Sequence, residues 1–157
     1  MNIRLISIGK TDEKSLDFLI NNYIKRLKHY IKFEFIIIPD IKNRKNLSFE
    51  QQKEKEGEII LKNIQNSDFV VLLDESGNAF TSVLFSKFLA KKMLSGIKNL
   101  VFVIAGPYGF SDNIYQRANN KLSLSKMTFS HQMIRLFVVE QVYRAFTILR
   151  NEPYHHE

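Results

Sequence analysis

Short apolar runs alternate with longer amphipathic segments along this chain, and this alternation restricts its fold more than any other feature. The run LVFVI at residues 100–104 is long enough for a buried strand and too short for a helix. Similar runs occupy residues 3–8, 33–38 and 69–73, and a shorter fifth run lies at 122–124. Buried strands separated by crossover helices predict an α/β fold with a mainly parallel sheet and flanking helices.

The intervening segments predict helices over residues 13–30, 48–63, 82–94, 111–120 and 131–149. In the first of these, apolar residues recur at helical spacing along one face. They are Leu16, Ile20, Tyr23, Leu27 and Tyr30. Ser48 is suited to cap the second helix, whose thin apolar face lies near its end, and Gly96 is suited to end the third.

The last predicted helix has more apolar surface than one sheet face requires. Its apolar residues are Ile134, Phe137, Val138, Val142, Ala145 and Phe146. Two explanations are open. The helix either forms a dimer interface or lies centrally within one chain and is packed on both sides.

Composition narrows the functional classes. A chain of 157 residues suits a single domain over residues 1–157, and the lack of cysteine excludes disulfides and a thiol nucleophile. No run approaches membrane-spanning length and the N-terminal residues lack a signal-peptide pattern, so we expect a cytoplasmic protein without a membrane partner. The net charge of +7 favours a polyanionic partner, and a basic loop at 41–47 contains Lys42, Arg44 and Lys45.

Several common sites are absent from the sequence. The four histidines lack the neighbouring carboxylates or cysteines and the spacing of a zinc site, so no metal is expected. No Gly-x-Ser-x-Gly or Gly-x-Gly-x-x-Gly pattern occurs. Gly9, Lys10 and Thr11 imitate the end of a phosphate loop, but the glycine that this motif needs earlier is replaced by Arg4.

Two unusual loops remain. The strand at 100–104 ends in Gly106, Pro107, Tyr108 and Gly109, which allow a tight turn and a close approach to a ligand. A second loop, LSKMTFS, follows the short strand at 122–124. Because parallel strands end at the same edge of a sheet, these loops predict a binding crevice there.

Four segments of the C-terminal third together resemble the SPOUT methyltransferases and, within them, the RlmH family that methylates large-subunit ribosomal RNA. They read GPYG at 106–109, LSKMTFSHQ at 124–132, EQVYRA at 140–145 and PYH at 153–155. The resemblance extends over the whole chain, through IGK at 8–10, KEG at 55–57 and LLD at 72–74.

The resemblance implies a SPOUT-type α/β fold with a C-terminal trefoil knot, a homodimer, and methylation of N3 of a pseudouridine in 23S rRNA, on the ribosome or as free RNA. It also implies that S-adenosyl-L-methionine is the cofactor. The implied cofactor-binding residues are Leu73, Gly106, Ser125, Lys126, Met127, Thr128, Phe129 and Ser130. Chemically, Leu73, Met127 and Phe129 can form a flat apolar slot for an adenine, and Gly106 leaves space for the ligand.

Methyl transfer requires alignment and removal of the N3 proton, so a general base or a favourable charge is expected. The candidate catalytic residues are Arg144, Tyr154, His155 and Glu140. Glu140 and Arg144 are spaced for a helix salt bridge, and a purely structural ion pair is the alternative explanation. Tyr154 and His155 follow a proline, which predicts an extended tail. The resemblance to a dimeric family implies that this tail reaches toward a cofactor pocket, of this chain or of a partner. The identity of the base stays open.

The chain departs from the family pattern at Ala105, where a glycine is usual, and at Ser130, where a proline is usual. A methyl at residue 105 is tolerable at a strand-like φ, and serine can still cap the next helix. Two other functions are alternatives. One is a non-catalytic, ribosome-associated RNA-binding protein of the same fold. The other is a receiver or flavodoxin-like domain, which the sequence SIGK after the first strand disfavours.

Overall fold

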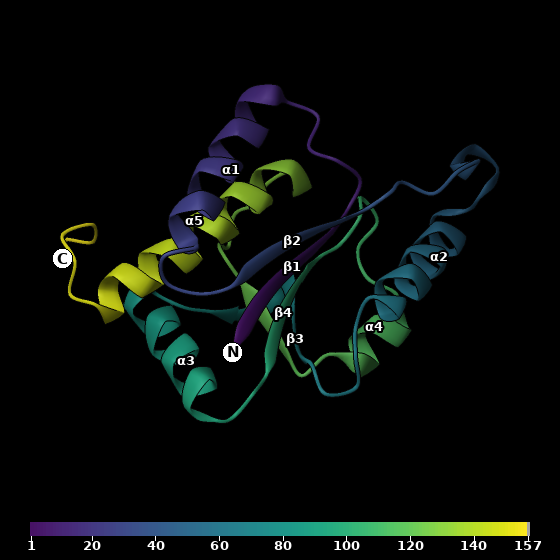
Figure 1. Cartoon of the computed structure of the whole chain (residues 1–157). Helices are drawn as coiled ribbons and strands as arrows, with labels where there is room; N and C mark the ends of the chain where they lie inside the picture. The colour runs from purple at the N-terminus through teal and green to yellow at the C-terminus, as the bar shows by residue number, and fades with distance from the viewer. Residues whose placement is uncertain (157) are drawn as a thin grey trace.

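The computed structural model describes residues 1–156 and places a parallel sheet between two layers of helices (Figure 1). The strands are β1 (Asn2–Ile8), β2 (Phe33–Ile38), β3 (Phe69–Ala79), β4 (Asn99–Ile104) and β5 (Asn120–Ser123). Their order is β2-β1-β4-β3-β5, and every neighbouring pair is parallel. The predicted α/β class with a parallel sheet is therefore confirmed.

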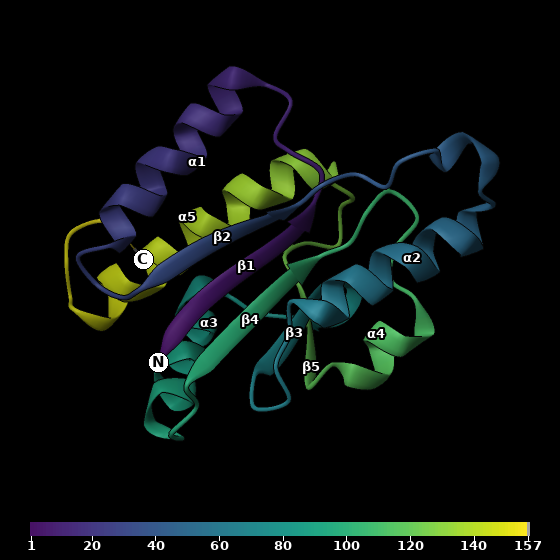
Figure 2. The same cartoon turned by 45° about the vertical axis from the view of Figure 1, so that its right-hand side comes forward.

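Helices cover both faces of the sheet (Figure 2). One face carries α1 (Lys14–Leu27), α3 (Ser82–Leu94) and α5 (His131–Leu149), and the other carries α2 (Phe49–Lys62) and α4 (Asp112–Arg117). Alternate residues of β1 and β4 supply the two cores, because successive side chains of a strand point to opposite faces. Leu5 and Phe102 belong to the core under α5, whereas Ile6 and Val103 belong to the core under α2.

Helix α4 is shorter than the segment 111–120 that was predicted to be helical. Ala118 already has an extended backbone, and Asn119 donates its backbone N–H to the carbonyl of Val70. The side chain of Asn119 accepts from the backbone N–H of Val70 in turn. These bonds draw the chain into β5, so the helix ends at Arg117.

Strand β3 is longer than the predicted strand at 69–73, because residues 74–79 continue it. Both Leu73 and Asn78 pair with Leu122 of β5, so the intervening residues form an irregularity in the ladder. Pairing with β5 is a long-range contact that the local sequence does not reveal. It keeps Asp74, Glu75 and Ser76 at the carboxyl end of the sheet.

Helix α5 is central within one chain, lying against α1, α3 and the sheet (Figure 2). Val138, Val142, Ala145 and Phe146 are buried in the core of the single chain. Packing within the chain therefore accounts for this part of its apolar surface. Within residues 1–156, no helix has the length and apolarity needed to cross a membrane.

Candidate functional site

A cavity of about 590 Å³ lies where β3, β4 and β5 end, and we call it the strand-end cavity. Its walls come from residues 73–76, from the glycine loop at 104–110 and from the loop at 122–129. The start of α5 closes it with His131 and Ile134. Its position at the carboxyl ends of adjacent parallel strands and its size both suit a small-molecule ligand.

The strand-end cavity brings together most of the residues that the sequence suggested for cofactor binding. Leu73, Gly106, Ser125, Met127, Thr128 and Phe129 line it. Lys126 and Ser130 are not among the lining residues. Ser130 instead caps α5, since its Oγ accepts from the backbone N–H of Met133 at 3.2 Å. The capping role predicted for this serine is therefore confirmed.

Each of the two loops around the cavity is held by a hydrogen bond within the loop. Gly109 donates its N–H to the carbonyl of Gly106 at 3.2 Å and has a φ of +84°, a conformation that favours glycine. In the second loop, Ser125 Oγ accepts from the N–H of Met127 at 2.9 Å. Ala105 is outside the left-handed region, so its methyl is compatible with the backbone there.

Acidic and phenolic groups are among the residues that line the cavity, and none of them belongs to the site residues predicted from the sequence. Tyr115 donates to Asp74 Oδ2 at 2.5 Å, and Ser76 donates to Asp74 Oδ1. Although burial alone would raise it, the pKa of Asp74 lies below its ordinary value because Ser76 and Tyr115 donate to the carboxylate and Lys121 is near. Burial and the bond to Asp74 raise the pKa of Tyr115 to about 12. The signal in the sequence was the position of Asp74 directly after a buried run.

Two apolar side chains of the second loop line the cavity and are exposed. Met127 is 75% exposed and Phe129 is 39% exposed, although both line the cavity. Apolar side chains left open beside a cavity are suited to cover a flat apolar ligand.

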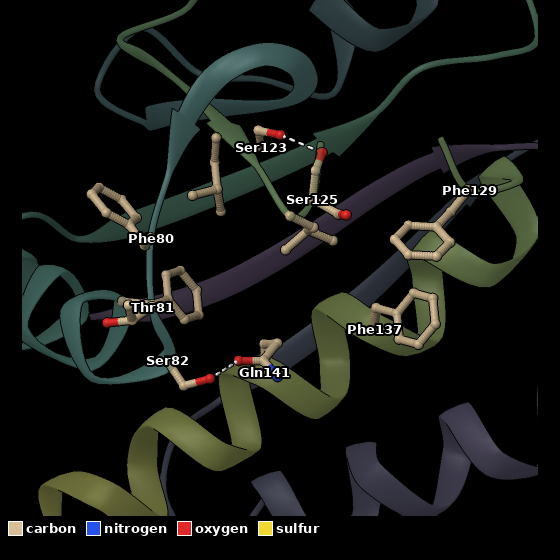
Figure 3. Close-up of a pocket in the computed structure, with 11 residues that line it drawn as sticks. Phe80, Thr81, Ser82, Ser123, Ser125, Phe129, Phe137 and Gln141 are labelled. Carbon is tan, nitrogen blue, oxygen red and sulfur yellow. Dashed lines mark hydrogen bonds between the residues drawn. The ribbon is translucent and has the colours of Figure 1, made fainter. Parts of the chain in front are cut away.

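A smaller cavity of about 330 Å³ adjoins the first and shares residues 122–125 and Phe129 with it (Figure 3). Phe129 and Phe137 meet on one side of it, with ring centroids 5.0 Å apart. On the other side, Ser82 Oγ donates to Gln141 Oε1 at 2.8 Å. Gln141 continues this chain of bonds by donating to Glu140 Oε2.

The four candidate catalytic residues lie together in one cluster, which we call the C-terminal cluster. Arg144 donates through Nε and Nη2 to Glu140 Oε1, at 3.0 and 2.6 Å. Tyr154 donates to the same oxygen at 3.0 Å, and its ring lies under the guanidinium of Arg144. Arg144 Nη1 lies 3.3 Å from His155 Nδ1. Because arginine has no acceptor, Nδ1 accepts this bond and a neutral His155 carries its proton on Nε2.

The charges of the C-terminal cluster follow from these contacts. The hydrogen bond to Glu140 raises the pKa of Arg144, against the effect of burial. Burial and hydrogen bonds with Tyr23 and Glu140 raise the pKa of Tyr154 well above its ordinary value. Both side chains therefore keep their protons.

In the described part of the chain, the C-terminal cluster does not line the strand-end cavity. Ile134 borders that cavity, and Arg144 lies ten residues further along α5, which is about 15 Å. The tail is also not extended as predicted. Residues 151–156 turn back, and the Tyr154 ring packs on Tyr143 at 4.8 Å. The tail therefore docks on the helix layer of its own chain.

Among residues 1–156, no group of three or more histidine, aspartate or glutamate side chains is placed to hold a metal ion.

Comparison with known proteins gives a consistent result. A family model described as a predicted SPOUT methyltransferase matches residues 1–155. The chain is 67% identical over 157 residues to a ribosomal RNA large subunit methyltransferase H from Flavobacterium johnsoniae, with all of both chains covered. It is 65% identical over 156 residues to the protein of that name from Christiangramia forsetii, with 99% of both covered. The protein of that name from Parabacteroides distasonis is 64% identical over 157 residues, again with full coverage.

Proposed function

Since the chain belongs to the SPOUT methyltransferases and, within them, to the RlmH family, we propose that it methylates large-subunit ribosomal RNA. The proposed cofactor is S-adenosyl-L-methionine, and the proposed target is N3 of a pseudouridine in 23S rRNA. The observation that carries the proposal is the strand-end cavity, whose lining includes six of the eight residues suggested for cofactor binding. An RNA substrate of this kind implies a cytoplasmic protein.

The residues of the strand-end cavity fit this cofactor. Asp74 and Glu75 suit a ligand that carries cationic ammonium and sulfonium groups. Leu73, Met127 and Phe129 offer apolar surface for an adenine, and the loop backbone offers donors and acceptors for its edge. When bound, the cofactor supplies an electrophilic methyl group, so the chain itself has to align the substrate and take up a proton.

The C-terminal cluster is the proposed substrate side of the site. Arg144 is a fixed cation that can hold an RNA phosphate or favour an anionic base. Because Arg144 and Tyr154 keep their protons, Glu140 and His155 are the two members left to accept one, and His155 can do so at Nδ1 only after it gives up its bond from Arg144.

We propose that a homodimer brings the C-terminal cluster of one chain close to the strand-end cavity of the other. Met133, Phe137, Glu140 and Arg144 recur at helical spacing along one stripe of α5, which we call the outer stripe. All four remain at least partly exposed in the single chain. A partner chain packed against this stripe would bring its own cluster toward the cavity. We also propose that the C-terminal third forms the trefoil knot that the resemblance to this family implies.

Two measurements test the proposed function. Calorimetry with S-adenosyl-L-methionine should show saturable binding to the purified protein. Mass mapping of 23S rRNA from cells lacking the gene should show one methyl group missing, and the purified protein should restore it. Binding of RNA without binding of the cofactor would instead support the non-catalytic alternative and overturn the proposal.

A further inference from the structure

A buried glutamate lies directly behind the glycine loop of the strand-end cavity. Glu56 belongs to α2, is only 3% exposed, and does not itself line the cavity. Its Oε1 accepts from Gln52 Nε2 at 2.9 Å, and Gln52 is also buried. Its Oε2 is buried and has no hydrogen-bond partner among residues 1–156. A carboxyl in this position needs an explanation, since unsatisfied buried polar atoms are costly.

The carboxyl of Glu56 occupies the space that a side chain at residue 106 would need. A Cβ added to Gly106 would lie 2.3 Å from Glu56 Oε2 and 2.8 Å from its Cδ. Gly106 does not have a positive φ, so an alanine is compatible with its backbone. A larger residue at 106 would therefore force the buried carboxyl of Glu56, on the far side of the loop, to move. The sequence alone explains this glycine by a tight turn and by the space needed for a ligand.

We propose that Glu56 is a positioning residue of the cofactor site, and that its carboxyl supports Gly106 from behind and keeps the glycine loop in its binding conformation. This inference rests on the proposed function, because it assigns the strand-end cavity to the cofactor. Gly106 connects Glu56 with the strand-end cavity, since it lies against Glu56 on one side and borders the cavity on the other.

The surroundings of Glu56 favour a neutral carboxyl. Burial raises its pKa, with Asp40 adding to the rise, while the bond from Gln52 and the charge of Arg44 act in the opposite direction. Ser111 at the start of α4 lies against the neighbouring Gly57, and its Oγ is likewise buried. A neutral carboxyl can pack against a peptide backbone without the cost of an unpaired buried charge. Glutamine has the same shape and should fill the same place.

A double-mutant cycle tests the contact. We expect Gly106→Ala to weaken S-adenosyl-L-methionine binding about tenfold in calorimetry, because the new methyl displaces Glu56. In a Glu56→Ala background, the same Gly106→Ala change should alter the affinity by no more than about twofold, because the colliding carboxyl is gone. Glu56→Ala alone should also weaken binding, since the loop loses its support. If Glu56→Ala does not fold, Glu56→Asp serves in its place, because it withdraws the carboxyl by one methylene.

Two further variants separate positioning from general stability. Glu56→Gln should bind the cofactor like the unchanged protein, and so should Glu54→Gln, which alters an exposed glutamate of the same helix. Melting temperatures on the same preparations show whether each variant is folded. An equal loss from Gly106→Ala in both backgrounds would overturn the proposal, since Gly106 would then act on the ligand alone. Unchanged affinity in every Glu56 variant would overturn it too. Failure of the unchanged protein to bind the cofactor would instead count against the proposed function.

Discussion

At the scale of single residues, the role of Arg144 distinguishes a catalytic function of the C-terminal cluster from a purely structural one. It donates to Glu140, contacts His155 and lies over the ring of Tyr154. These contacts also describe a simple ion-pair network, which contributes little to stability when it is partly exposed. The two roles predict different consequences when the guanidinium is removed.

We expect Arg144→Ala to lower methyl transfer about tenfold or more while the cofactor affinity changes by less than about twofold, because the side chain acts on the substrate. Methyl incorporation, calorimetry and melting temperature on one preparation provide the measurement. A lowered melting temperature with normal transfer per folded molecule would leave Arg144 a structural role only.

Glu56 should also make the stability of the folded chain depend on pH. Burial raises its pKa in the folded chain, so the folded state holds this proton more tightly than the unfolded state does. Its contribution to the free energy of unfolding is therefore greatest below the ordinary glutamate pKa of about 4.3 and falls as pH rises through the folded pKa. Urea unfolding at several pH values measures it.

The same titration of Glu56→Gln isolates the effect, because other carboxyl groups remain in both proteins. Asp74 has the opposite shift, so its contribution is lost as pH falls. The free energy of unfolding of the unchanged protein, minus that of Glu56→Gln, should fall as pH rises. A difference that is constant with pH would show that Glu56 ionises as it does in the unfolded chain.

At the scale of elements, the basic loop at 41–47 lies at the same edge of the sheet as the strand-end cavity, because it follows the carboxyl end of β2. Lys42, Arg44 and Lys45 are exposed, and only Arg44 has an ion-pair partner, Asp40, in the described residues. An RNA strand along this edge can reach the loop and the cavity together.

Replacing Lys42, Arg44 and Lys45 by alanine should weaken RNA binding and flatten its dependence on salt. Each lost phosphate contact lowers the logarithmic slope by about 0.7 to 0.9, so three contacts lower it by roughly 2 to 3. Binding to 23S rRNA over a range of salt concentrations measures the slope. The matched control replaces Lys28, Lys32 and Lys98, exposed residues that do not lie on this loop. Equal slopes for the two triple variants would mean that the loop has no special role.

At the scale of the whole molecule, the outer stripe of α5 is the surface proposed to join two chains. Val138 is only 2% exposed and belongs to the core of one chain, so a charge there would unfold the protein rather than separate a dimer. Met133 is 38% exposed and lies one turn before Phe137, which makes it the better probe of an interface.

Met133→Asp should convert a dimer to a folded monomer, because an unpaired carboxylate would be buried between the chains. Sedimentation at micromolar concentration measures the mass, and circular dichroism shows that the chain remains folded. Leu94→Asp is the control, since Leu94 is an exposed apolar residue at the end of α3. A monomeric mass for the unchanged protein would contradict the dimer.

Periodicity and turn chemistry depend on neighbouring residues, so the local features of this protein were predictable from its sequence. It predicted the parallel α/β sheet, the strand 33–38 and the helix 131–149 at their observed bounds, the caps at Ser48 and Ser130, and the two loops that line the cavity. The resemblance to a family added the residues of the cofactor site.

Contacts between distant residues arise from packing rather than from local pattern, so they become visible only in the folded chain. The sequence pattern around Glu56 is typical of the surface of a polar helix, yet packing places this residue behind Gly106. Arg135 also reads as polar surface, but it is fully buried and donates to the carbonyl of Ile8. Asp74 reaches the cavity because β3 pairs with a strand almost fifty residues later in the chain. The tail turns back because Tyr154 finds partners on α1 and α5, at Tyr23 and Glu140.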